Sequence, residues 1–351
     1  MPKPQSRRNE PIHKTVTITK VIVISTALTF IFLAVLAISS LVGTVRIGLW
    51  QGLQGLLWGW QEHSGVLNSL ERTILFSIRL PRALFAGIVG ASLSLAGVVF
   101  QALLRNPLAD PYILGISGGS AVGAMAGIII GAGALTFGTA GFAFLGALST
   151  IFLALGIAGK GRVIQSTTLL LAGVIINAFF SALIMFLIAI SSNADLHNVM
   201  FWLMGDLSMA SQSEILASAF FLLFGFIVIY GDGRALNLIT TGEETAMQLG
   251  VNVEQAKRRL FVTASLVTAV AVSMSGIIGF VGLMIPHMMR MTVGSDHRLL
   301  LPAATLFGAS FLALADTIAR TAMAPTELPV GVITALCGAP YFIFLLRKRV
   351  F

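Results

Sequence analysis

The chain has 351 residues, of which 56% are hydrophobic and 10% charged, and its formal net charge is +8. A soluble domain carries about 25% charged residues, so this composition excludes a soluble globular protein and indicates an integral membrane protein. The basic residues lie at the ends of apolar runs, which disfavours nucleic acid as a partner and favours a role in membrane orientation. The single cysteine, Cys337, excludes an internal disulfide.

The apolar runs predict about ten transmembrane helices, because about 20 residues are needed to cross the hydrocarbon core of a bilayer. A basic cytoplasmic tail, 1–20, comes first, and residues 21–351 then form one transmembrane domain. The eighth expected helix is short, and Gly276, Gly279 and Gly282 blur its border with the seventh. The expected helices are 21–42, 82–103, 113–131, 138–158, 167–190, 213–230, 258–277, 279–291, 299–319 and 330–346.

The distribution of positive charge predicts the orientation of these helices. An even number of crossings places both chain ends on the same side of the membrane. With both ends in the cytoplasm, most of the 22 Lys and Arg residues lie inside. That asymmetry follows the positive-inside rule, so we expect an all-α polytopic membrane protein with both termini cytoplasmic. The residues left outside are Arg46, Arg72, Arg79, Arg82 and Arg320.

The segment 43–81 is the longest one expected on the outer side. It carries Trp50, Trp58 and Trp60, with leucines at near-helical spacing. Tryptophan is enriched where a membrane meets water, so we expect an amphipathic helix lying at the outer surface.

Glycine recurs every four residues through the third expected helix, from Gly115 to Gly131. Residues four apart share one face of a helix, so these glycines predict a smooth ridge against which a neighbouring helix packs closely. We interpret the repeat as architecture and not as a nucleotide-binding loop.

The longest cytoplasmic loop, 231–257, contains a pattern typical of a short helix. Thr241 followed by Glu244 fits a capping box, and Gly250 suits the position just beyond a helix C-terminus. We therefore expect a helix of about eight residues outside the membrane. Two interpretations stay open, a solvated connector or a rigid coupling helix that docks into a motor subunit.

The sequence contains no recognisable catalytic constellation. Segment 156–161, GIAGKG, lacks the Ser or Thr of a phosphate-binding loop and follows an apolar run, not a strand. We therefore expect no enzyme activity, no metal site and no bound cofactor, so partner subunits would hydrolyse any ATP that drives transport. Asp316 and His287 are the candidates for ionisable groups at membrane depth, which proton-coupled transporters need. An ion-coupled secondary transporter is thus disfavoured, but it stays the alternative from another class.

An ordered series of motifs covers residues 79–349. The chain reads RLPR (79–82), QALLRNPLADP (101–111), LGISGG (114–119), LLLAGV (169–174), GEETAMQLGV (242–251), GFVGLMIPHMMR (279–290), DHRLLLP (296–302), ADTIAR (315–320) and ELPVGVITALCGAPYF (327–342). In this series the chain resembles FecCD-type permeases, the membrane subunits of ATP-binding-cassette (ABC) importers for ferric siderophores, heme and vitamin B12. The resemblance implies a vitamin B12 importer permease-like fold, multi-pass in the bacterial cytoplasmic membrane.

The resemblance also implies partners and site residues. A second permease, identical or homologous, pairs with the chain around a central path lined by the fifth and tenth helices; two cytoplasmic ATPase subunits lie below, and an extracytoplasmic binding protein delivers substrate. Arg79, Arg82 and Arg320 match outward arginines that meet acidic residues of the binding protein, and the charge distribution also places them outside. The ATPase-contacting loop corresponds to Thr241, Gly242, Glu243, Glu244, Thr245, Ala246, Leu249 and Gly250. A cytoplasmic constriction corresponds to Asn106, Leu108, Ser166 and Thr167.

Ferric siderophore is the expected cargo, with heme and vitamin B12 as alternatives. Selectivity in such importers lies largely in the binding protein, and no residue of this chain separates the three classes. Because a siderophore brings its own metal ligands, the path needs no metal site.

Overall fold

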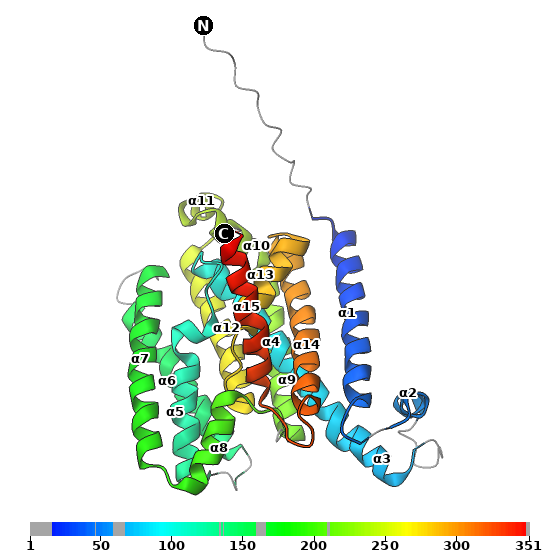
Figure 1. Ribbon diagram of the computed structural model, residues 1–351. Coiled ribbons are helices and arrows are strands. Elements are labelled where there is room, and N and C mark those ends of the chain that lie inside the picture. The colour runs from blue at the N-terminus through cyan, green and yellow to red at the C-terminus, as the bar shows by residue number, and fades with distance from the viewer. Residues whose placement is uncertain are drawn as a thin grey trace.

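The structure, a computed structural model, describes residues 16–45, 47–58, 67–132, 135, 137–158, 166–208 and 211–348. Every regular element in these ranges is a helix (Figure 1). Most of the expected basic tail lies outside the described residues, as does Trp60.

Each expected transmembrane segment corresponds to a helix. Eight helices of the described chain are long and apolar enough to cross a membrane by length and composition. Helices α5 and α13 are shorter, with 14 and 13 residues. The ten helices are α1 (Ile18–Leu41), α4 (Leu80–Leu103), α5 (Ile116–Ile129), α6 (Gly138–Ala158), α7 (Ser166–Ile190), α9 (Gln212–Gly231), α12 (Val253–Ser275), α13 (Val281–Val293), α14 (His297–Thr321) and α15 (Val330–Arg347).

Helix α4 forms the centre of the bundle. In the 18-residue apolar window of its candidate membrane span, 89% of the residues are buried, whereas in that of α1 only 6% are buried. Gly90 lets α4 approach α14 closely, because a Cβ at this position would overlap the backbone of Gly308. At the edges α1 lies beside α14 and α7 beside α6 (Figure 1). The exposed apolar faces of these edge helices suit contact with lipid or with another membrane subunit.

The glycine ridge packs α5 against α6. A Cβ on Gly119 would overlap the carbonyl of Gly146, and a Cβ on Gly123 that of Phe142. The predicted close packing is confirmed for this part of the repeat. The ridge is shorter than the five-glycine pattern, because Gly115 and Gly131 have φ angles of 79° and 74° and lie at the two helix ends.

The outer segment contains the expected helix, α2 (Leu49–Trp58), but it also contributes to the next span. Helix α3 (Ser69–Thr73) and the π-helix η1 (Ile74–Arg79) run on into α4, so the helical stretch extends from 69 to 103. Helix α8 (Asn193–Met204), between α7 and α9, was not expected. Its mixed sequence, NADLHNVMFWLM, has no clear helical repeat of apolar residues.

The cytoplasmic loop forms two short helices where the sequence predicts one. They are α10 (Gly233–Thr241) and α11 (Glu243–Gln248). The predicted capping box is wrong, because Thr241 ends α10 and its hydroxyl donates to the Leu238 carbonyl at 2.8 Å. The predicted role of Gly250 is confirmed. Its N–H donates to Met247 O and that of Val251 to Ala246 O, both at 3.0 Å, which closes α11 with a Schellman motif.

Candidate functional site

Two breaks between helices meet inside the bundle. Residues 104–115, which include the 3₁₀ helix η2 (Pro111–Leu114), follow α4, and residues 276–280 follow α12. The Tyr112 hydroxyl donates to the Ile278 carbonyl at 2.5 Å and accepts from the Ile278 N–H at 2.9 Å. Backbone groups at membrane depth need partners within the protein, and the phenol supplies both partners at this break.

Proline and glycine explain why the helices stop here. Pro107 and Pro111 cannot donate a backbone hydrogen bond, so α4 cannot continue through them. Gly276 ends α12 with a φ of 68°. Phe280 has a φ of 69°, unusual for a residue with a Cβ, and its ring packs where Gly338 of α15 leaves space.

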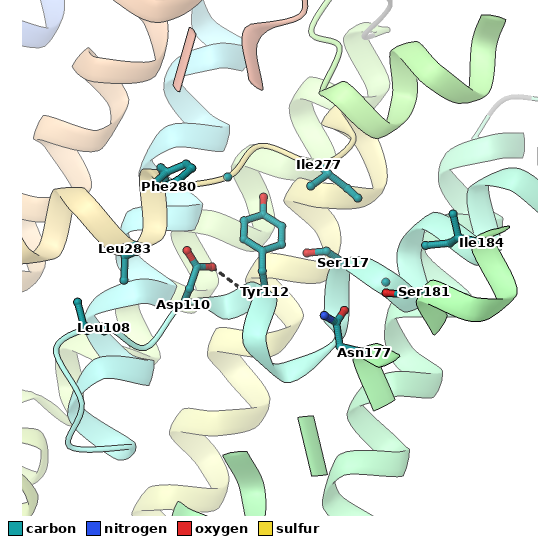
Figure 2. Close-up of a pocket in the computed structure, with 12 residues that line it drawn as sticks. Leu108, Asp110, Tyr112, Ser117, Asn177, Ser181, Ile184, Ile277, Phe280 and Leu283 are labelled. Carbon is teal, nitrogen blue, oxygen red and sulfur yellow. Dashed lines mark hydrogen bonds between the residues drawn. The ribbon is translucent and has the colours of Figure 1, made fainter. Parts of the chain in front are cut away.

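A cavity of about 500 Å³ opens at this junction (Figure 2). Its wall is mostly apolar, and among the described residues it contains one carboxylate and no Lys, Arg or His. The carboxylate of Asp110 accepts the Tyr112 N–H at 2.9 Å. Figure 2 shows Asn177 and Ser181 of α7 across from Asp110 and Tyr112. An apolar wall with a few polar groups is typical of a ligand site. The lining residues are Leu108, Asp110, Tyr112, Ser117, Gly118, Asn177, Ser181, Ile184, Ile277, Gly279, Phe280 and Leu283.

The residues of the expected constriction lie in the turn after α4 and at the start of α7. Leu108 lines the main cavity, and the Asn106 side chain accepts the Leu108 N–H at 2.9 Å, which fixes the turn after α4. Ser166 begins α7, and Thr167, the next residue, is exposed. The four residues therefore stay a proposed constriction.

Residues 241–250, called the coupling segment here for their expected role, are tied to the bundle through Glu243, the first residue of α11. Its Oε1 lies 3.1 Å from Nη2 of Arg105, at the end of α4, and 3.0 Å from Nζ of Lys257 in α12. Ala246 is buried against α10 and α12, whereas Leu249 is 57% exposed. The segment thus has one side anchored in the bundle and another side exposed.

The three outer arginines lie around one cavity of about 170 Å³, but they are more buried than the charge distribution suggests. Arg79 is 4% exposed and donates to the carbonyls of Leu41, at 2.9 Å, and Val45, at 2.6 Å. Arg320 is 6% exposed, and its Nη2 donates to the Ser39 carbonyl. These two side chains tie the end of α1 and the following turn to the bundle.

Arg82 faces two carboxylates of its own chain. Its Nε and Nη2 donate to Asp316 at 3.0–3.1 Å, and its Nη1 donates to Glu327 at 2.7 Å. Asp316, expected as a candidate for a group at membrane depth, is thus held between Arg82 and Arg320, whose Nε lies 3.7 Å away. The arrangement is a paired ionic cluster and not a lone titratable group.

Comparison with known proteins decides the family. The model of the FecCD transport family matches residues 22–348. The chain belongs to the FecCD transport family. It is 45% identical over 278 residues to the cobalamin import permease BtuC of Halobacterium salinarum. That alignment covers 79% of this chain and 74% of BtuC. It is 41% identical over 329 residues to the hemin transport permease HmuU of Yersinia pestis, which covers 91% of this chain and 95% of that protein.

A solved structure agrees with the fold of this FecCD permease. An ABC transporter described as metal-chelate type, in an inward-facing conformation, superimposes with a TM-score of 0.81 at 33% identity. The match covers 93% of this chain and 99% of that chain. The FecCD chain is therefore a multi-pass permease subunit of an ABC importer in the bacterial cytoplasmic membrane. Such importers combine a partner permease with separate ATPase subunits.

Sequence reasoning did not single out the polar lining of the main cavity in this FecCD permease. Two signals were present. Asn177 and Ser181 are four residues apart, so they share one face of an otherwise apolar helix. Asp110 directly precedes Pro111, an Asp-Pro pair typical of a helix start, and it places a carboxylate between two apolar runs.

Proposed function

We propose that this permease passes a neutral or cationic metal chelate, with ferric siderophore as the substrate, from an extracytoplasmic binding protein to the cytoplasm. The observation that carries the proposal is the cavity at the two interrupted helices. Transporters commonly bind substrate where discontinuous helices expose backbone and polar groups near the bilayer midplane. Relatives named for cobalamin and hemin, and a structure described as metal-chelate type, support a cargo of this class.

The charge of the cavity favours some chelates over others. Asp110 is its one carboxylate, and no basic residue of the described chain lines it. A negative group in an apolar wall repels an anionic ligand, so hemin, which has two propionates, fits less well than a neutral or cationic chelate. Ferric hydroxamates and cobalamin meet this condition, and cobalamin is the principal alternative substrate.

The coupling segment supports an ATP-driven cycle. In this proposal an ATPase subunit contacts the exposed side of α11, around Leu249. Glu243 passes the movement to Arg105, which directly precedes Asn106 of the constriction. The cavity above then opens to one side of the membrane at a time, as the segments beside it shift together.

The outer arginines supply the proposed docking face. Arg82 is the most accessible of the three, and Glu327 already occupies one of its donors. A carboxylate of the binding protein would replace Glu327 at this donor. Complementary charge of this kind mainly speeds association and fixes register.

Uptake of labelled substrates tests the proposal. Cells with and without the chain are given a ferric hydroxamate, a ferric catecholate, hemin and cobalamin, and each measurement is repeated with Arg82→Glu. Loss of hydroxamate uptake in both the deletion and the variant is the expected result. Loss of cobalamin uptake alone would assign cobalamin as the substrate in place of ferric siderophore. Uptake that persists without ATP but collapses with an uncoupler would contradict the ABC mechanism.

A further inference from the structure

A second cavity, of about 280 Å³, lies at the cytoplasmic end of the bundle, where α4, α10, α13 and α14 meet. Its wall includes two arginines and, among the described residues, no carboxylate. The charge is thus opposite to that of the main cavity. The polar side chains that matter here are Gln101, Arg105, Asn106, Arg290, Ser295 and His297.

Arg290 is a partly buried cation without a counter-ion. Its Nη1 donates to Gln101 Oε1 at 3.0 Å, and in the described part of the chain no carboxylate lies within ion-pair distance of it. Removing a guanidinium from water without pairing it costs free energy. An anion in the cavity would recover part of that cost.

His297 lies in the same wall, and one of its ring nitrogens has no hydrogen-bond partner. Asn237 Oδ1 accepts from the His297 N–H at 2.9 Å and lies 2.7 Å from Nδ1, while Asn237 Nδ2 donates to Asp296 at 2.9 Å. Because that amide oxygen can only accept, Nδ1 carries the proton and Nε2 presents a lone pair. His297 is 3% exposed, and Nε2 has no hydrogen-bond partner. A ligand with an acidic hydroxyl would satisfy it.

The acidic residues beside the cavity are already engaged. Glu243 pairs with Arg105 and Lys257. Asp296 accepts from Asn237 and Arg298, with Arg298 Nη2 at 2.6 Å. In the described residues neither carboxylate is available to Arg290, which leaves its charge open to an anion from another molecule.

We propose that this cytoplasmic cavity binds a phosphate-bearing anion. Its ionised oxygens pair with Arg290 and Arg105, and the remaining P–OH donates to Nε2 of His297. A carboxylate would leave Nε2 without a donor, whereas monohydrogen phosphate or a phosphate monoester supplies both groups. The phosphate is either a free cytoplasmic one or the monoester headgroup of phosphatidic acid. This proposal does not depend on the identity of the transported substrate.

Thermal unfolding of the purified full chain in nanodiscs tests the proposal and separates the two sources. In the first arm, discs of phosphatidylcholine are titrated with inorganic phosphate against chloride at constant ionic strength. In the second arm, phosphatidic acid replaces part of the lipid and retained lipid is identified by native mass spectrometry. We expect a saturable rise in Tm of about 3 °C or more in at least one arm, since a ligand that binds only the folded state stabilises it.

Three variants decide whether this cavity is responsible. Ser295→Asp introduces a carboxylate at an exposed position of the wall and should abolish the rise by occupying the cations. Arg290→Gln should abolish it too, and Arg258→Gln, an exposed arginine outside the wall, should keep it. If Arg290→Gln fails to fold, Ser295→Asp decides alone. An equal rise in wild type and Ser295→Asp, or no rise in either arm, overturns the proposal.

Discussion

Arg82 forms one ion pair with a buried carboxylate and another with an exposed carboxylate. The exposed carboxylate competes with any acidic residue of a partner that approaches Arg82 from outside. Asp316 is 1% exposed and Glu327 is 47% exposed. Replacing Glu327 with Gln leaves the buried pair and removes the exposed competitor. An exposed ion pair is worth about 0.2–1 kcal/mol, so we expect the binding protein to associate about 1.4–5-fold more tightly.

To measure this affinity, transporter in nanodiscs is immobilised on a surface, and binding of the soluble binding protein is recorded at low and at high salt. Glu214→Gln is the matched control, because Gln also serves in the capping box that Glu214 completes with Ser211 at the start of α9. The control should bind like wild type. Weaker binding by Glu327→Gln would show that Glu327 assists docking and does not compete with it.

Glu243 joins three elements through one oxygen, so its replacement tests coupling directly. Glu243→Gln removes the ion pairs to Arg105 and to Lys257, which is 3% exposed. We expect a loss of about 1–3 kcal/mol in unfolding free energy, because a buried cation loses a charged partner. In proteoliposomes with the ATPase subunits, ATP hydrolysis should continue while uptake falls. Exposed Glu254→Gln should change neither property, and unchanged uptake in Glu243→Gln would refute this link.

Sequence reasoning at the residue scale located charges but not their partners. The distribution of basic residues along the chain predicts that Arg82 lies on the outer side of the membrane. Its partners, Asp316 and Glu327, lie 234 and 245 residues away in sequence, and no local pattern connects them. The capping box failed for a related reason. Thr241 ends one helix and Glu244 lies in the next, with Gly242 at a φ of 145° between them.

The packing of α5 on α6 predicts that a Gly→Ala substitution, which usually stabilises a helix, destabilises this protein. In an exposed helix, Gly→Ala is stabilising by about 0.5–1 kcal/mol. At Gly123 a Cβ would overlap the Phe142 carbonyl, so Gly123→Ala should lower Tm. At Gly141 of α6 a Cβ would meet no other atom within 4 Å, so Gly141→Ala should hold or raise Tm. Scanning fluorimetry in detergent compares the pair, and equal shifts would contradict the ridge.

One hydroxyl satisfies both backbone groups of Ile278 at the break between α12 and α13. Tyr112→Phe leaves the N–H and the carbonyl of Ile278 without the partner that now bonds to both. An unsatisfied buried polar group costs about 1–3 kcal/mol, so we expect a clear fall in Tm together with slower uptake. Tyr230→Phe, at the cytoplasmic end of α9 and 41% exposed, should behave like wild type. A Tyr112→Phe variant as stable as wild type would mean that the break does not need the phenol.

Helices were predictable where their signal was local. Apolar runs fixed the spans to within a few residues, because the length of a run and its flanking charges are properties of the chain itself. Helix α8 was missed, since its mixed composition lacks a helical repeat. The cavity was missed for another reason. It forms where 104–115 meets 276–280, and that meeting is a tertiary contact.

At the scale of the whole molecule, the chain divides into a packed centre and two open faces. Helices α4, α12 and α14 are largely buried, whereas only 17% of the membrane window of α7 and 28% of that of α15 is buried. In a lone chain this exposure suits lipid, and in the proposed dimer it suits a path shared between two permeases. These alternatives differ in whether water reaches α15.

Cys337 reports on this difference without any added cysteine, because it is the single cysteine of the chain and is exposed on α15. A charged maleimide reacts with a thiol in contact with water and not with one facing hydrocarbon, since thiolate forms poorly in an apolar medium. We expect Cys337 in the assembled importer to be labelled, and its labelling rate to change when a non-hydrolysable ATP analogue is added. Cys337→Ser supplies the background. Labelling by a lipid-soluble maleimide alone would place α15 against lipid and remove it from the path.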